Sequence, residues 1–271
     1  HFLYFCILRL RSKRVKPRLI LKEHIRKSIK VLSKHPSLIR LLFVMYGEPI
    51  LLASESSRRA SILESIRIPF IKVLPSIDET IFDNLDPAER VVALAATKAK
   101  HGKALWSEKN RSKKVVISSS AKKPLDKNAL DQKSNAEPRY VLGADTLVAF
   151  KISGRWITLG KPANELEAFE MLSMEAGKRQ TVFSGLCLLD MVSDRCYPAL
   201  SISEVQFAPM TPEEVSWYLS FGEWRGAAGA YRIQEIGSCF IEEIRGSSSG
   251  VMGLPIHELY GILHASGYLD S

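Results

Sequence analysis

The sequence feature that most constrains the fold is an eleven-residue run, YVLGADTLVAF (140–150), in which nearly every side chain is apolar. A continuous apolar run of this kind is typical of a strand that is covered on both faces. Its one carboxylate, Asp145, is disfavoured in strands and costly to bury unpaired. We therefore expect a buried strand whose Asp145 is paired with a cation, serves in catalysis, or bonds to nearby backbone amides.

Short apolar runs and amphipathic segments surround this strand. The apolar runs predict strands at residues 49–53, 69–74, 156–159, 181–191, 199–207 and 239–244. Helical spacing and N-cap residues predict helices at residues 57–66, 87–100, 164–174, 211–222 and 255–265. Because these elements do not follow a strict β-α-β order, we expect an α/β fold with a mixed, twisted sheet and flanking helices.

The net charge of +9 over 271 residues comes from two segments. Residues 1–44 hold 12 Lys and Arg and one acid, and residues 99–139 hold 11 Lys and Arg and four acids. The remaining residues therefore carry a net charge of −9 (9 − 11 − 7). This distribution argues against nucleic-acid binding by the core, and leaves the two basic segments as candidates for binding nucleic acid or an acidic membrane.

The same distribution suggests how the chain is divided. We expect residues 1–44 to be a basic extension, either a transit peptide, a basic amphipathic helix, or (the favoured interpretation) upstream sequence joined to a protein that starts at Met45. Residues 45–271 would form the folded domain, with a disordered basic insertion at about 101–139. No apolar run approaches the roughly 18 residues of a membrane span, and four cysteines without metal-ligand spacing indicate reduced thiols in a cytoplasmic protein.

Residues 51–61, LLASESSRRAS, end a predicted strand and begin a predicted helix. The helix N-terminus and the hydroxyls of Ser54 and Ser56 offer hydrogen-bond donors to an anion, and Arg58 and Arg59 match phosphate oxygens. The pattern fits a polyanion site, but taken alone it favours an ordinary capped helix with two solvated arginines. The chain has no GxxxxGK[ST] motif, which excludes a P-loop NTPase.

Three further segments carry groups that suit a phosphate substrate. IDE (77–79) follows a predicted strand, and its carboxylates together with Asp145 suit a hard divalent cation. Lys161 projects from the tight turn LGKP, and the small-residue turn at 226–237 presents Gln234, whose amide can donate to and accept from a base edge. Each segment alone is equally a solvated or close-packed turn. Together they supply carboxylates for a metal, cations for phosphates and an amide for a base.

In their order along the chain, these motifs resemble the Maf family of nucleoside triphosphate pyrophosphatases, which is related to the ITPase-like fold. Eight ordered matches between residue 48 and about residue 265 are far more specific than any one of them. The matching motifs are ASESSRR, IDE, the lysine of ATKAK, LGADT, LGKP, the SG of VFSG, GE followed by AGAYRIQ, and VMGLP.

The resemblance implies a fold in two lobes around a cleft, and Mg²⁺- or Mn²⁺-dependent cleavage between the α- and β-phosphates that yields a nucleoside monophosphate and pyrophosphate. Asp145 would be the catalytic carboxylate, as general base or as metal ligand, and Glu79 would assist with the metal. Lys98 and Lys161 would complete the catalytic set. The residues implied to hold the triphosphate and to offset charge on the leaving pyrophosphate are Ser54, Ser56, Arg58, Arg59, Lys98 and Lys161.

Base choice, by the same resemblance, rests on Arg58, Thr146 and Gln234. The run AGAYRIQ is similar to the branch acting on dTTP and UTP, with modified pyrimidine triphosphates as further substrates. The alternatives are the branch that prefers 7-methyl-GTP and a non-catalytic nucleotide-binding regulator of cell division. The resemblance also implies a homodimer.

Several positions depart from the family pattern near the implied site. Ser57 replaces a proline, which should loosen the loop before the arginines. Glu235 replaces a glycine, which adds a negative charge and a φ penalty. The other departures are Gly226-Ala227 for Asp-Lys, and Ser248 and Gly250 for tyrosine and asparagine. We expect reduced activity or shifted specificity from this group.

Overall fold

The computed structural model describes residues 48–117 and 137–270. The predicted extension at 1–44 and residues 118–136 of the predicted insertion lie outside this part of the chain. Within the two described ranges, no helix is long and apolar enough to cross a membrane. The cysteines found there are free thiols, namely Cys187, Cys196 and Cys239.

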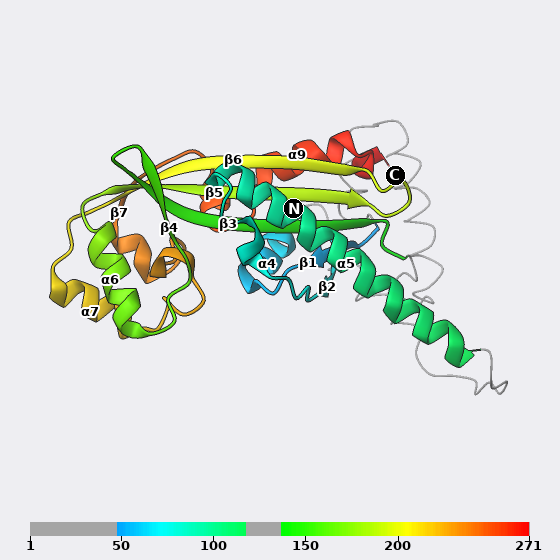
Figure 1. Ribbon diagram of the computed structural model, residues 1–271, viewed down its shortest axis with the longest axis horizontal. Coiled ribbons are helices and arrows are strands. Elements are labelled where there is room, and N and C mark those ends of the chain that lie inside the picture. Colours follow the sequence, from blue (N-terminus) through cyan, green and yellow to red (C-terminus); the bar gives the residue numbers. More distant parts are fainter. Residues whose placement is uncertain (1–47, 118–136, 271) are drawn as a thin grey trace, which may run out of the picture. The chain divides into compact units, whose positions relative to one another are not determined.

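In the described residues, seven strands form one mixed sheet in the order β2-β1-β3-β5-β6-β7, with β4 paired to β3 (Figure 1). The strands are β1 (Ile50–Ala53), β2 (Phe70–Val73), β3 (Tyr140–Ile152), β4 (Arg155–Leu159), β5 (Arg179–Asp190), β6 (Cys196–Phe207) and β7 (Ile241–Arg245). β1 runs parallel to β2 and β3, whereas β4 and β5 run antiparallel to β3. The mixed sheet expected from the element order is confirmed.

The helices flank this sheet on both faces. They are α4 (Ser57–Ser65), α5 (Pro87–Ile117), α6 (Glu165–Glu175), α7 (Pro212–Leu219), α8 (Ser248–Val251) and α9 (Ile256–Ala265), with 3₁₀ turns η1 (Glu79–Phe82), η2 (Ala228–Ala230), η3 (Ile236–Phe240) and η4 (Tyr268–Asp270). α5 crosses one face of the central strands, while α6 and α7 gather at one end of the sheet (Figure 1).

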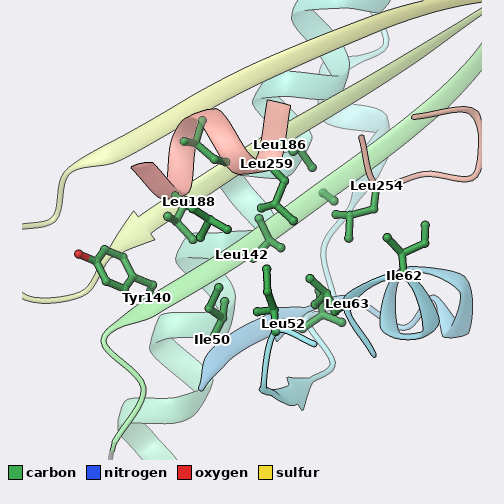
Figure 2. Close-up of a cluster of buried hydrophobic side chains, with 14 of the residues drawn as sticks. Ile50, Leu52, Ile62, Leu63, Tyr140, Leu142, Leu186, Leu188, Leu254 and Leu259 are labelled. Atoms are coloured by element: carbon green, nitrogen blue, oxygen red, sulfur yellow. The ribbon is translucent and has the colours of Figure 1, made fainter. Parts of the chain in front are cut away.

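The buried side chains divide along the length of β3. Its first half packs with β1, α4 and α9 in one apolar cluster, where Leu142 meets Leu52 and Leu259 (Figure 2). Its second half, from Val148 onward, packs with α6, α7 and the η2 turn in another cluster. Asp145 lies between the two clusters, so the central strand carries its carboxylate at the junction of two packed regions.

The prediction that helical structure stops at residue 100 is wrong, because α5 continues to Ile117. The extension packs on the sheet: a Cβ at Gly102 would lie 2.8 Å from the Cβ of Ala53, and Trp106 contacts the cluster beneath α5. Lys103 bonds to the Met191 carbonyl oxygen at 3.1 Å. Ser107 and Lys109 lie on the exposed side of this helix, so residues 101–117 are not a loop.

Candidate active site

A cavity of about 1030 Å³ opens beside the junction in β3. It is lined by the ends of β1 and β4, by the N-terminus of α4, by one side of α5 and by the turn that follows η2. Every site residue predicted from the sequence lines it: Ser54, Ser56, Arg58, Arg59, Glu79, Lys98, Asp145, Thr146, Lys161 and Gln234. The fold therefore brings together segments that are up to 180 positions apart in the chain.

Two glycines let α5 lie directly on the sheet. A Cβ at Gly143 of β3 would lie 2.0 Å from the carbonyl oxygen of Ala95, and a Cβ at Gly185 of β5 would lie 2.4 Å from Val91 backbone atoms. No side chain fits in that space. The close approach places Lys98, one turn along α5, against the carboxylate of β3.

Lys98 joins the two carboxylates of the cavity. Its Nζ lies 2.6 Å from Asp145 Oδ1 and 2.7 Å from Glu79 Oε1. The Lys98 and Asp145 side chains are each 11% exposed, whereas that of Glu79 is 48% exposed. Asp145 is thus a buried carboxylate with a cationic partner, which is one of the alternatives the sequence allowed.

The pKa of Glu79 lies below its usual value because of the cations around it. Burial acts to raise this pKa, but the hydrogen bond from Lys98 and the charges of Lys98, Lys161 and Arg59 outweigh it. Glu79 is therefore ionised at neutral pH and faces the cavity as a carboxylate.

Arg59 forms the floor of the cavity. Its Nε donates to the Gly253 carbonyl oxygen at 2.8 Å, its Nη1 to Ser54 Oγ at 3.0 Å and its Nη2 to Thr146 Oγ1 at 3.1 Å. Burial lowers the pKa of Arg59, while the charges of Asp145 and Glu79 raise it. Within the described residues no carboxylate forms an ion pair with this guanidinium. An anion in the cavity would meet a fixed positive charge.

Arg58 and Lys161 face the same space with fewer constraints. No hydrogen bond or ion pair to Arg58 occurs in the described ranges, and burial and then the charges of Arg232 and Arg59 lower its pKa. Lys161 is exposed, on the short connection between β4 and α6. Both side chains are available to a bound anion.

The donor set suits a hard divalent cation. In the described residues no group of three or more His, Cys, Asp or Glu is placed to hold a metal by itself. Asp145 and Glu79 nevertheless present two carboxylates around a single cationic centre, Lys98 Nζ. Mg²⁺ is commonly held by one or two protein carboxylates with substrate phosphates and waters completing its shell. The residues present therefore fit such an ion.

The turn that carries Gln234 is built without the strain expected at Glu235. Glu235 has φ −125°, so the predicted φ penalty for replacing a glycine there is wrong. The left-handed positions of the turn are Gly226, Gly229 and Ala230, with φ 69°, 70° and 62°. The Gly229 N–H donates to the Gly160 carbonyl oxygen at 3.1 Å. The Glu223 carboxylate accepts from the N–H groups of Ile236 and Gly237, which fixes the far end of the turn.

Several residues of the site were not assigned individually from the sequence. Arg225 and Arg232 line the cavity on either side of the glycine-rich turn. Ser184 of β5 donates to the Gly250 carbonyl oxygen at 2.7 Å and lies 3.1 Å from Thr146 Oγ1, beneath Arg59. The positive charges of Arg225 and Arg232 could have indicated phosphate binding from the sequence. The role of Ser184 could not be predicted, because it depends on a contact across 66 positions.

Comparisons with known proteins agree with this arrangement. A family model described as Maf-like protein matches residues 49–266. A protein named dTTP/UTP pyrophosphatase from Treponema denticola is 36% identical over 222 residues, which cover 81% of this chain and 97% of that protein. Proteins of the same name from Clostridium acetobutylicum (36% identical, covering 80% of this chain and 98% of the relative) and Neisseria meningitidis serogroup A (34%, covering 80% and 94%) are similar over the same extent. By the family model and by these relatives, the chain belongs to the Maf family.

Proposed function

We propose that this protein is a hydrolase that cleaves dTTP and UTP between the α- and β-phosphates, giving the nucleoside monophosphate and pyrophosphate. The observation that carries the proposal is a single cavity in which Lys98 joins two carboxylates opposite Arg58, Arg59 and Lys161. The printed name of the relatives described above, dTTP/UTP pyrophosphatase, gives the same activity and substrates.

The cations would bind the triphosphate before any bond changes. Arg59 is fixed in the floor, and Arg58 and Lys161 are left to close on phosphate oxygens, with the hydroxyls of Ser54 and Ser56 beside them. These charges would also offset the charge that develops on the leaving pyrophosphate, which is where electrostatic catalysis has its largest effect.

Asp145 would supply the chemical step. A water molecule attacks the α-phosphorus, its proton passes to the Asp145 carboxylate or to solvent, and the bond to the β-phosphate oxygen breaks. Asp145 and Glu79 would also hold the Mg²⁺ or Mn²⁺ ion, which when bound polarises phosphate oxygens and favours attack by water. Lys98 holds the two carboxylates close together, and its hydrogen bond and charge lower the pKa of Glu79.

Base choice would rest on Gln234 and Arg58, with Thr146 acting through another residue. The Thr146 hydroxyl is already bonded to Arg59 and lies 3.1 Å from Ser184 Oγ, so we propose that it sets the position of Arg59. Gln234 is exposed in the cavity wall, where its amide can both donate to and accept from a uracil or thymine edge.

The decisive experiment is pyrophosphate release from a panel of nucleoside triphosphates with Mg²⁺ or Mn²⁺. We expect dTTP and UTP to be cleaved fastest and 7-methyl-GTP poorly, and Asp145→Asn to lower kcat by about 10²–10⁴-fold. Equal rates in Asp145→Asn would refute the role of Asp145. Nucleotide binding with no turnover of any triphosphate would refute the activity and favour the regulator.

We also propose that residues 45–271 form the catalytic domain and that the protein works in the cytoplasm. The core itself would not bind nucleic acid, which leaves any such binding to the basic segments. Removal of residues 1–44 should leave dTTP hydrolysis intact. If that deletion also leaves salt-sensitive binding to nucleic acid or acidic vesicles unchanged, the extension has no such binding role. Light scattering would test the expected homodimer.

A further inference from the structure

Outside the hydrogen-bonded cavity floor, the least expected buried group is the carboxyl of Glu175, in the last turn of α6. The residue is 0% exposed, and neither carboxyl oxygen has a hydrogen-bond partner in the described structure. Burial raises the pKa of Glu175 well above its usual value. An acid in such surroundings is expected to be neutral, because a buried charge without a partner costs several kcal/mol.

This carboxyl lies directly behind the turn that forms one wall of the cavity. A Cβ built on Gly229 would lie 2.6 Å from Glu175 Oε1 and 3.2 Å from Tyr231 Cε1, so both side chains press on the same glycine. Tyr231 lines the cavity, yet its hydroxyl is buried and has no hydrogen-bond partner among residues 48–117 and 137–270. One surface of the turn thus meets the proposed substrate and the opposite surface meets Glu175.

The turn is also connected to the loop that carries a phosphate-binding lysine. The Gly229 N–H donates to the Gly160 carbonyl oxygen at 3.1 Å, next to Lys161 in the chain. The same loop leads into α6, whose other end holds Glu175. A displacement of Gly229 would therefore move both the turn that carries Gln234 and the loop that carries Lys161.

The surroundings of Glu175 tolerate its neutral form only. Among the described residues, the titratable group that interacts with Glu175 is Tyr231, whose own pKa is also raised by Tyr218 of α7. Among the described residues no Lys or Arg charge acts on the carboxyl, and desolvation alone shifts its pKa. Gly229 has φ 70° and no side chain to shield the oxygens. An ionised carboxyl would have to draw in water or push the turn away.

We propose that Glu175 is a positioning residue whose neutral carboxyl holds the 228–234 turn against the Gly160–Lys161 loop, and whose ionisation releases that turn and weakens nucleoside triphosphate binding. The inference rests on the proposed function, because it assigns a role relative to the same cavity. It adds a protonation requirement outside the residues that touch the substrate.

The test uses the full chain and two neutral variants, Glu175→Gln and Glu175→Leu, with Glu170→Gln as the matched control. Glu170 is an exposed glutamate of the same helix. The Kd of α,β-methylene-UTP, which cannot be cleaved at that bond, is measured by calorimetry across roughly pH 6 to 9. The midpoint of urea unfolding is measured at the same values. Ionisation of the uracil ring affects all four proteins equally, so only the differences between them count.

We expect the Kd of the wild type and of Glu170→Gln to rise with pH, by up to about tenfold per unit once the carboxyl ionises. The Kd of both neutral variants should rise less, with an unfolding midpoint that gains on the wild type as pH increases. Kd profiles that coincide for the wild type and either folded neutral variant would overturn the proposal. Tight, pH-dependent binding without hydrolysis of UTP itself would refute the proposed function and leave this inference standing.

Discussion

Replacing Lys98 by methionine removes one charge from the centre of the site and keeps the length of the side chain. In the wild type, Lys98 Nζ lies 2.6 Å from Asp145 Oδ1 and 2.7 Å from Glu79 Oε1. The two carboxylate oxygens can therefore be no more than about 5.3 Å apart, the sum of these distances. In the variant they face each other with no cation between them.

The cost follows from Coulomb's law. At about 5.3 Å and an effective dielectric constant of about 20, two carboxylates repel by about 3 kcal/mol. Because the Glu79 side chain is 48% exposed, solvent screens part of this repulsion and we expect roughly 1–2 kcal/mol. The repulsion raises the pKa of Glu79 in the variant.

The sign of the pH dependence is fixed by the wild type. Burial acts to raise the pKa of Glu79, but Lys98, Lys161 and Arg59 lower it overall. A carboxyl with a lowered pKa stabilises the fold above its unfolded pKa, and this stability is lost as pH falls through the folded pKa. Lys98→Met should therefore lose most stability near pH 7 and least near about pH 4.

Urea unfolding of both proteins at these two pH values measures the effect, with Lys151→Met as a control on an exposed lysine. Hydrolysis of dTTP by Lys98→Met should also fall, by about 10²-fold or more, since a charge that orders the site is lost. A loss of stability that is equal at both pH values would refute the electrostatic argument. Added Mg²⁺ should recover more stability in the variant than in the wild type, because it can take the place of the lost charge.

Three other substitutions test the sheet and the cavity floor. Gly143→Ala places a Cβ 2.0 Å from the Ala95 carbonyl oxygen and should cost about 3 kcal/mol or prevent folding, as denaturant titration would show. The pKa of Asp190 is held low chiefly by its hydrogen bond from Arg139. The Asp190→Asn variant should therefore lose about 1–2 kcal/mol of unfolding free energy at pH 7, and progressively less at acid pH. Ser184→Ala should raise KM for dTTP several-fold with little change in kcat, and an unchanged KM would refute its support of the cavity floor.

The fold was predictable wherever a local pattern decides the structure. The apolar run around Asp145 does form the central strand, and Thr211 and Glu214 form the capping box that begins α7. The prediction failed at residue 100, where a polar, lysine-rich composition suggested a loop. Trp106 and the missing side chain of Gly102 keep that segment helical against the sheet, and this packing depends on strands distant in sequence.

The residues that line the cavity together were also predictable as a group, because each motif presented a side chain suited to phosphate or metal. The contacts that each of them makes were not. Arg59 looked like a second phosphate ligand, yet it bonds to the Gly253 carbonyl oxygen 194 positions away. Glu175 gave no signal at all, since a glutamate near the end of an amphipathic helix is ordinarily solvated. Only the packing of α6 against Gly229 shows that it is buried.

The turn before the arginines is held more firmly than we expected from a sequence with Ser57 in place of a proline. Ser54 Oγ accepts the Ser56 N–H at 3.2 Å and Arg59 Nη1 at 3.0 Å, and Ser56 Oγ accepts the Arg59 N–H at 3.4 Å as the N-cap of α4. Hydroxyl bonds and a side-chain anchor therefore hold this turn. These bonds hold Arg59 but not the Arg58 side chain, so the two arginines differ in their surroundings.

Arg59 is hydrogen-bonded into the cavity floor, whereas Arg58 lines the cavity and is proposed to bind the ligand, and lysine substitution tests this difference. A lysine has a single charged nitrogen and cannot reproduce three bonds in different directions, so Arg59→Lys should cost about 1–3 kcal/mol of stability as well as activity. Arg58→Lys breaks no described bond and should leave the unfolding midpoint unchanged while KM for dTTP rises. Equal losses of stability in both variants would contradict this division. Such a result would place Arg58 in the framework of the turn and leave substrate binding to Arg59 and Lys161.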